Sequence, residues 1–163
     1  MSAVVVSDTS PLQYLILTQA VESLPHFFDR VYIPTAVAVE LKHASSPSAV
    51  RDWIASLLSW AIIQSVSPVN LGVKLGSGEV EAISLALALK VQAVLIDDQK
   101  AKLAARRLGL DVVGTLTVLE RAAGNGYIDL KAALSALRRT SFHVRPGLLE
   151  QVWERHLKNS ANV

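Results

Sequence analysis

The 163-residue sequence predicts an α/β domain with a mainly parallel central sheet. Short apolar runs rich in β-branched residues alternate with stretches of helical periodicity, and Gly and Pro residues separate them. The expected strands are apolar throughout instead of alternating with polar residues. That pattern is typical of a sheet whose two faces are both covered by helices.

The N-terminal half of the chain is expected to hold three strands and three helices. Residues 3–7 form a β-branched run that suits a buried strand. Ser10 is expected to be the N-cap of the next helix, because Pro11 suits a first helical position. The expected strands are 3–7, 31–33 and 62–66, the last at an edge of the sheet, and the expected helices are 11–19, 35–44 and 47–59.

The C-terminal half is expected to contribute two further strands and a series of helices. Residues 78–90 are apolar nearly all round a helix, which predicts a buried helix. Residues 1–163 are expected to form a single domain, with about 141–163 as a C-terminal helical extension. The expected strands are 93–96 and 112–113, and the helices are 78–90, 99–108, 115–123, 130–139 and 146–157.

Composition excludes several classes of protein. The chain has no cysteine, which rules out a disulfide scaffold and thiol catalysis, and its 51% hydrophobic content rules out a disordered chain. The longest apolar stretch, 83–96, is broken by Lys90 and Gln92, and the N-terminus lacks the basic region of a signal peptide. We therefore expect a cytoplasmic protein without a membrane span. A mean hydropathy of +0.36 favours an apolar subunit interface, hence a homodimer or larger assembly.

The net charge of +2 conceals two halves of opposite sign. Residues 1–99 hold nine acidic and five basic residues, whereas residues 100–163 hold five acidic and eleven basic residues. This division suits an acidic metal site beside a track for a polyanion, and it also suits ordinary solvated helix faces.

Polar residues follow three of the expected strands. Asp8 follows the first strand, Asp97 and Asp98 follow strand 93–96, and Thr115 comes soon after strand 112–113. The carboxyl ends of parallel strands meet at one edge of a sheet, where ligands bind in such folds. Each of these residues could instead be a helix N-cap.

Three further acidic residues lie on expected helices. Glu40 falls on the apolar face of its helix, where an unpaired carboxylate would be costly, unless it lies at the edge of that face and reaches solvent. Glu79 and Glu81 are two residues apart in a first helical turn, so at most one of them is expected to face a shared site. First-turn acids also favour the helix dipole without any other role.

Converging carboxylates predict a site for a hard cation. Such a group cannot stay fully ionised without cations, and oxygen ligands select Mg²⁺ or Mn²⁺. Beside a basic flank, one or two such ions suggest phosphodiester hydrolysis. The histidines match no zinc signature, and no nucleophile elbow or phosphate-binding loop is present. The basic flank is the helix that carries Lys100, Lys102, Arg106 and Arg107, which also suits a solvated helix face.

The ordered arrangement of these motifs resembles the PIN domain, and within it a small prokaryotic, VapC-like branch. The resemblance extends to about residue 140 and implies a three-layer α/β/α fold. No single motif is specific, but their order and spacing are. The matching segments are residues 4–12, 39–41, 78–86, 95–98 and 114–116.

The resemblance assigns roles to the candidate residues. The first two acids of the family map to Asp8 and Glu40, and the third maps to Glu81, with Glu79 as the substitute. The fourth maps to Asp98 in preference to Asp97. Metal contact is expected from Asp8 and Asp98, with Asp97 and Glu81 as further candidates, while Glu40 and Glu81 complete the site or orient water. The possible supporting residues are Thr9, Ser10, Glu79 and Thr115.

The resemblance implies an Mg²⁺- or Mn²⁺-dependent endoribonuclease that hydrolyses RNA, the toxin of a toxin–antitoxin pair with an antitoxin protein as partner. The basic residues 100, 102, 106 and 107 would then attract the RNA backbone. One alternative is a non-catalytic PIN-like module that binds RNA or protein. Another is a phosphatase of the haloacid-dehalogenase type, but that family expects a second Asp where Ser10 stands.

Overall fold

The computed structural model describes residues 3–162 of the chain and contains a five-stranded sheet at its centre. All four strand pairings are parallel, and the strand order is β3-β2-β1-β4-β5. The predicted α/β class with a mainly parallel sheet is therefore confirmed. The strands are β1 (Val4–Ser7), β2 (Arg30–Pro34), β3 (Ala61–Gln64), β4 (Ala93–Leu95) and β5 (Asp111–Val113).

Apolar side chains on both faces of the strands explain why the strands lack polar alternation. Val5 and Val6 are neighbours in β1 and both fully buried, but they belong to two different hydrophobic clusters. Successive strand side chains point to opposite faces, so each face needs its own apolar cover. Val94 and Leu95 repeat this division in β4.

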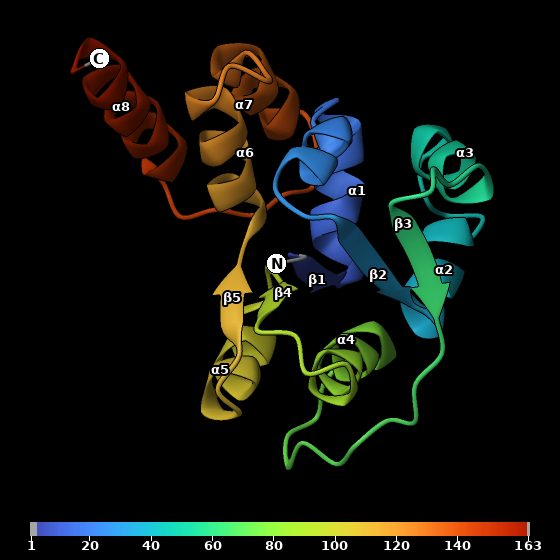
Figure 1. Ribbon diagram of the computed structural model, residues 1–163. Helices are drawn as coiled ribbons and strands as arrows, with labels where there is room; N and C mark the ends of the chain where they lie inside the picture. Colours follow the sequence, from blue (N-terminus) through green and yellow to red (C-terminus); the bar gives the residue numbers. More distant parts are fainter. Residues whose placement is uncertain (1–2, 163) are drawn as a thin grey trace.

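Helices cover both faces of the sheet (Figure 1). The smaller cluster lies under α4 and α5, whereas the larger cluster gathers the other helices and extends from Val5 to Val152. Helix α2 packs against both α3 and α4. The helices are α1 (Thr9–Leu17), the 3₁₀ helix η1 (Val21–His26), α2 (Thr35–Lys42), α3 (Ser48–Ala55), α4 (Ser77–Ala88), α5 (Gln99–Arg107), α6 (Thr115–Gly124), α7 (Leu130–Arg138) and α8 (Leu148–Ala161).

The register of the strands brings their carboxyl ends to one edge. Ser7 of β1 lies opposite Leu95 of β4, and Leu95 lies opposite Val113 of β5. The Asp8 amide donates to the Leu95 carbonyl at 2.9 Å, which continues the pairing one step past β1. The residues that follow β1, β4 and β5 are therefore neighbours in space.

Several helix ends differ from the sequence-based expectation. Helix α1 begins at Thr9 with Asp8 in the N-cap position, so Ser10 and Pro11 lie inside its first turn and the expected Ser10 cap is wrong. Proline is tolerated there because first-turn amides have no partner within the helix.

Two further helices were misjudged at their ends. Helix α3 stops at Ala55, well before the expected end at residue 59. Gly147 adopts a left-handed backbone with φ of 83°, which delays the start of α8 to Leu148. Helix α8 then continues to Ala161, past the expected end at residue 157. The 3₁₀ helix η1 was not expected from the sequence.

Within residues 3–162, no helix has the length and apolar character needed to cross a membrane.

Candidate active site

Asp8 lies at the centre of the carboxyl edge of the sheet. Asp8 directly follows β1, the middle strand, and only 4% of its surface is exposed to solvent. Although Asp8 occupies the N-cap position of α1, its side chain makes no capping hydrogen bond to that helix. The carboxyl group is therefore buried without the ordinary structural role of a residue in this position.

Glu40, near the end of α2, is held on two sides. The Thr9 hydroxyl donates a hydrogen bond to Glu40 Oε2, and the Gly78 amide donates to Glu40 Oε1 at 3.2 Å. These contacts join α2 to the first turns of α1 and α4. Ser10, the other hydroxyl residue predicted here, is partly buried one residue beyond Thr9.

Gly78 is a site residue that sequence reasoning missed. A Cβ atom at this position would lie 2.8 Å from Glu40 Oε1 and 2.9 Å from Oε2, too close for an undisturbed carboxylate. Glycine therefore leaves the space that Glu40 occupies. A glycine in the first turn of a buried helix, where alanine is the better helix former, is the signal that points to this position.

Glu79 and Glu81 point to different partners, as their spacing predicted. Glu79 Oε2 accepts the Gly76 amide at 3.0 Å, and its charge acts on the carboxyl group of Asp8. Glu81 Oε1 accepts the Ala36 amide at 3.2 Å in the first turn of α2. The structure thus associates Glu79 with the Asp8 site, whereas Glu81 caps a neighbouring helix.

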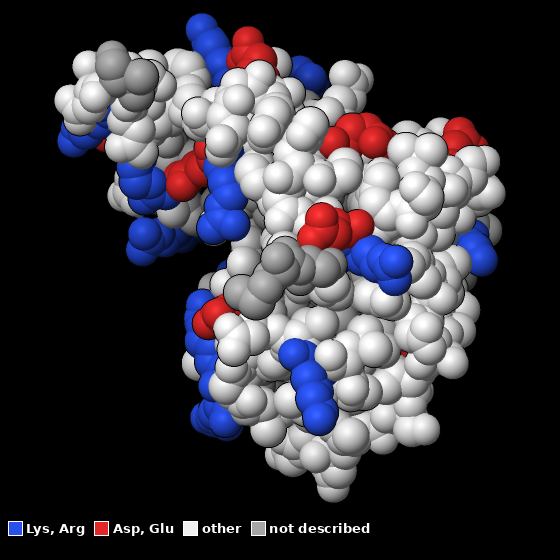
Figure 2. All heavy atoms as spheres, viewed as in Figure 1, with Lys and Arg blue, Asp and Glu red and all other residues white. Residues whose placement is uncertain are grey.

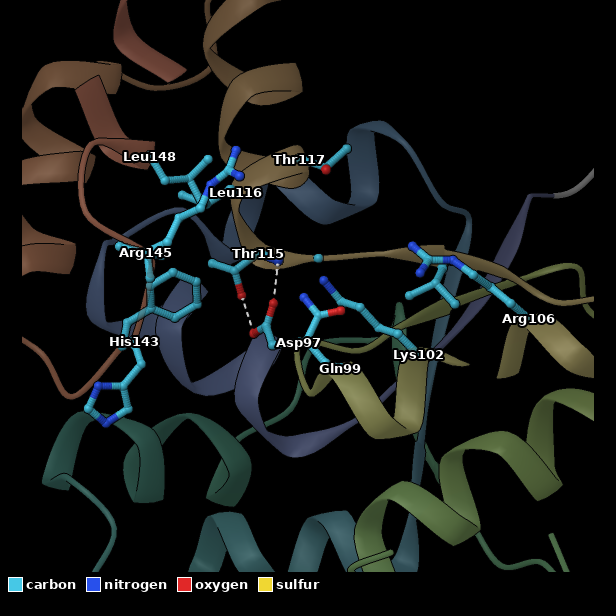
Figure 3. Close-up of a pocket in the computed structure, with 14 residues that line it drawn as sticks. Asp97, Gln99, Lys102, Arg106, Thr115, Leu116, Thr117, His143, Arg145 and Leu148 are labelled. Atoms are coloured by element: carbon cyan, nitrogen blue, oxygen red, sulfur yellow. Dashed lines mark hydrogen bonds between the residues drawn. The ribbon is translucent and has the colours of Figure 1, made fainter. Parts of the chain in front are cut away.

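Asp97 is tied to the start of α6 by two hydrogen bonds from Thr115 (Figure 3). The Thr115 amide donates to Oδ1 at 2.8 Å, and the Thr115 hydroxyl donates to Oδ2 at 2.6 Å. Thr115 is fully buried. This pairing fixes the orientation of the Asp97 carboxylate at the end of β4.

Asp98 has a structural role of its own. Its Oδ1 accepts the Ala101 amide at 2.9 Å, which makes Asp98 the N-cap of α5. Its charge also raises the pKa of Glu79. Asp98 therefore lies on the Glu79 side of the site, whereas the charge of Asp97 acts on Asp8.

Burial and mutual repulsion shift the pKa values of three of these acids. The pKa of Asp8 is raised to about 7: burial is the largest cause, the charges of Glu79, Glu40 and Asp97 add to it, and the hydrogen bond from the Thr9 backbone opposes it. The pKa of Glu79 is raised by burial and by nearby acids. Burial also raises the pKa of Asp97, against the lowering effect of its hydrogen bonds from Thr115 and of the nearby Lys102 charge.

The donor chemistry of this site fits a hard cation. All the candidate ligands are carboxylates, and repulsion from Glu79, Glu40 and Asp97 adds to burial, the main cause, in raising the pKa of Asp8. The carboxylates are not closely grouped, because among residues 3–162 no three histidine, aspartate or glutamate side chains are arranged so that they could hold a metal ion together. Asp8, Glu79, Asp97 and Asp98 are the residues that would hold an ion here.

The predicted basic residues of α5 divide between its faces. Lys100 lies near enough to Glu79, and Lys102 near enough to Asp97, to lower the pKa of each acid. Arg106 lines a cavity that also contains Asp97, whereas Arg107 is exposed and does not line it. Figure 2 shows basic side chains gathered on the side of the molecule that carries α5 and the C-terminal helices.

Comparison with known proteins defines the class of this domain. A family model described as the PIN domain matches residues 4–158. A PilT N-terminus domain protein from the hyperthermophilic archaeon Sulfolobus solfataricus P2 has a similar fold, with a TM-score of 0.50 and 15% sequence identity. The match covers 87% of this chain and 99% of that one. No curated protein matches the chain.

The parallel sheet with acids at its carboxyl edge is thus the α/β/α architecture of a nuclease-like domain. The chain belongs to the PIN-domain family, whose members are generally nucleases that use divalent metals.

Proposed function

We propose that this chain is an Mg²⁺- or Mn²⁺-dependent endoribonuclease whose active site is centred on Asp8. The observation that carries the proposal is the burial of the Asp8 carboxyl group among the charges of Glu40, Glu79 and Asp97. Keeping acids together in a buried place costs stability, which argues for a functional reason. Membership in a family of nucleases supports the reaction type.

The side chains have separable roles in this proposal. Asp8 and Asp97 would hold the ion together with Glu79, whose charge acts on Asp8, and Asp98, whose charge acts on Glu79. A bound ion would activate water and stabilise the leaving oxygen of the phosphodiester. Thr115 keeps the Asp97 carboxylate in one orientation through its two hydrogen bonds.

Glu40 has a neighbouring role. Thr9 and Gly78 hold its carboxylate in place, where it can position a water molecule or the substrate. This assignment retains Asp8, Glu40 and Asp98 from the sequence prediction. It gives Asp97 a larger part, and it prefers Glu79 to Glu81 because Glu81 is engaged with α2.

The first experiment is cleavage of a mixed-sequence fluorogenic RNA by the wild type and by Asp8→Asn, with Mn²⁺, Mg²⁺ or EDTA. We expect metal-dependent cleavage by the wild type and a loss of at least about 100-fold in the variant, with unchanged circular dichroism. Full cleavage by Asp8→Asn would overturn the assignment. Hydrolysis of small phosphate esters instead of RNA would favour the phosphatase alternative.

A second candidate function is a PIN-like module that binds RNA without cutting it. The spacing of the carboxylates favours it, because no ready three-ligand group is present among residues 3–162. Salt-sensitive RNA binding by the wild type, with no cleavage under any metal condition, would establish this alternative.

The toxin role and the antitoxin partner are proposals supported by the sequence resemblance. An acidic site could accept a basic side chain from such a partner. Co-purification with the product of a neighbouring gene would support this partner.

A further inference from the structure

A cavity of about 650 Å³ opens beside the acidic site (Figure 3). It lies between α5, the start of α6 and residues 142–148, which form the later part of the α7–α8 connection and the first residue of α8. Asp97 belongs to its lining, so the cavity and the site around Asp8 share a wall. Its volume falls in the range of pockets that hold small ligands.

The lining carries more positive than negative charge. Lys102 and Arg106 are four residues apart and therefore share one face of α5, while Arg145 and His143 come from the C-terminal segment. Asp97 is the acidic residue of the lining, and its oxygens already accept hydrogen bonds from Thr115. Cations on two sides of one hollow favour an anionic ligand.

The basic side chains of this cavity are available to a ligand. Within residues 3–162, the salt bridges pair Arg138 with Glu150 and Arg155 with Glu120, so Lys102, Arg106 and Arg145 are not part of an ion pair. Arg145 makes a long hydrogen bond of 3.4 Å to Gln151.

The cavity also offers polar and apolar groups suited to a nucleotide. Leu116 and Thr117 lie in its lining in the first turn of α6, where amide groups point out of the helix and favour negative charge. Phe142 and Leu148 add an apolar side that a ribose or base can contact.

We propose that this cavity binds the phosphate and sugar of a nucleotide next to the scissile bond, within a single strand of RNA. Residues 142–148 are then part of the substrate site and not merely a connection to α8. This inference rests on the proposed nuclease function, because Asp97 places the cavity beside that active site.

The test is binding of a short fluorescent single-stranded RNA in EDTA, measured by anisotropy so that no cleavage is needed. Arg106→Ala is compared with Arg107→Ala, which removes the same charge from the same helix outside the cavity; in contrast to the sequence prediction, this inference gives Arg107 no contact with the RNA. Arg145→Ala is compared with Arg139→Ala, which removes the same charge from the same connection between α7 and α8 at a position outside the cavity. All four arginines are exposed, so the variants are expected to fold, and circular dichroism checks this.

We expect Arg106→Ala and Arg145→Ala to weaken binding about 10-fold, and each matched control to weaken it less than about 2-fold. Each cavity variant should also reduce the slope of log affinity against log salt by about 0.7. Equal losses in a variant and its control, or no RNA binding by the wild type, would overturn the cavity proposal.

Cleavage with Mn²⁺ is measured separately on the same proteins. Wild-type cleavage together with equal losses of binding in variant and control would leave the nuclease proposal standing and remove the cavity proposal. Selective loss of binding in the cavity variants without wild-type cleavage would retain the cavity as an RNA-binding site and remove the nuclease proposal.

Discussion

Asp8 lies at the end of the middle strand, where burial and three neighbouring acids act on one carboxyl group. Its pKa rises to about 7, so near neutral pH the carboxyl is protonated in about half of the molecules when no cation is bound. In the proposed mechanism, a bound cation would relieve the repulsion between Asp8 and its three acidic neighbours and so favour the ionised carboxylate. The ionisation of Asp8 therefore links pH to the stability of the fold.

The raised pKa of Asp8 predicts that the metal-free wild type loses stability as pH rises. The unfolded chain ionises Asp8 near 3.8 and the folded chain near 7, so the folded state holds the extra proton between these values. Relative to Asp8→Asn, the free energy of unfolding should fall between about pH 4 and 7, by up to about 4 kcal/mol.

Denaturant unfolding in EDTA at pH 4.5 and 8 measures this difference. Asp52→Asn, an exposed carboxylate on α3, is the control and should follow the wild type at both pH values. An equal gap between the wild type and Asp8→Asn at the two pH values would contradict the prediction.

At the scale of single elements, the start of α4 carries two acidic residues with different roles, Glu79 in the first turn and Glu81 just after it. Glu79 accepts the Gly76 amide and faces the acidic site, while Glu81 accepts the Ala36 amide and supports the start of α2. Residues two apart in a helix lie about 200° apart around its axis, so these roles cannot be exchanged. Gly78 lies between them and leaves room for Glu40.

This division predicts opposite effects for two matched substitutions. Glu79→Gln should lower metal-dependent RNA cleavage at least about 10-fold without loss of stability, because it removes a repelling charge from the site. Glu81→Gln should cost about 0.5–1 kcal/mol of stability by removing a negative charge from the N-terminus of α2, while cleavage is retained.

Cleavage rates and urea unfolding of the two variants, measured side by side, check both parts. A larger loss of cleavage in Glu81→Gln than in Glu79→Gln would restore Glu81 as the third acid of the site.

At the scale of the whole molecule, the fold places the acidic and basic parts of the chain against one another. The carboxylates of the site come from residues 8–98, whereas the basic lining of the cavity comes from residues 102–145. Helix α8 also contributes to the core: its buried Leu149 and Val152 belong to the same hydrophobic cluster as Val5 of the central strand. The C-terminal helix is thus packed into the core.

Deletion of residues 142–163 should therefore destabilise the entire fold. Losing the buried Leu149 and Val152 alone should cost about 3 kcal/mol or more, which lowers the melting temperature by roughly 10 °C. Deletion of residues 160–163, which leaves those side chains in place, is the control. Calorimetry of the three proteins gives the answer, and an unchanged melting temperature in the longer deletion would show that α8 is dispensable for the core.

The fold was largely predictable because its signals are local. Five apolar runs alternate with helical stretches, and each run became a strand of one parallel sheet. The order of acids along the chain also predicted which side chains follow strand ends, as with Asp8 and Asp97. Helix ends were less predictable: a proline at residue 11 suits several first-turn positions, so it did not locate the start of α1.

The composition of the site depended on contacts between distant residues. Glu40 and Gly78 are 38 positions apart, and Ala36 and Glu81 are 45 apart, so the choice between Glu79 and Glu81 needed the packing of α2 against α4. The cavity likewise needed the path of residues 142–148 across α6. The sequence by itself determined the strand runs, the acids at their ends and the division of charge. The tertiary structure decided which acids share a site, because that depends on how helices rotate and pack.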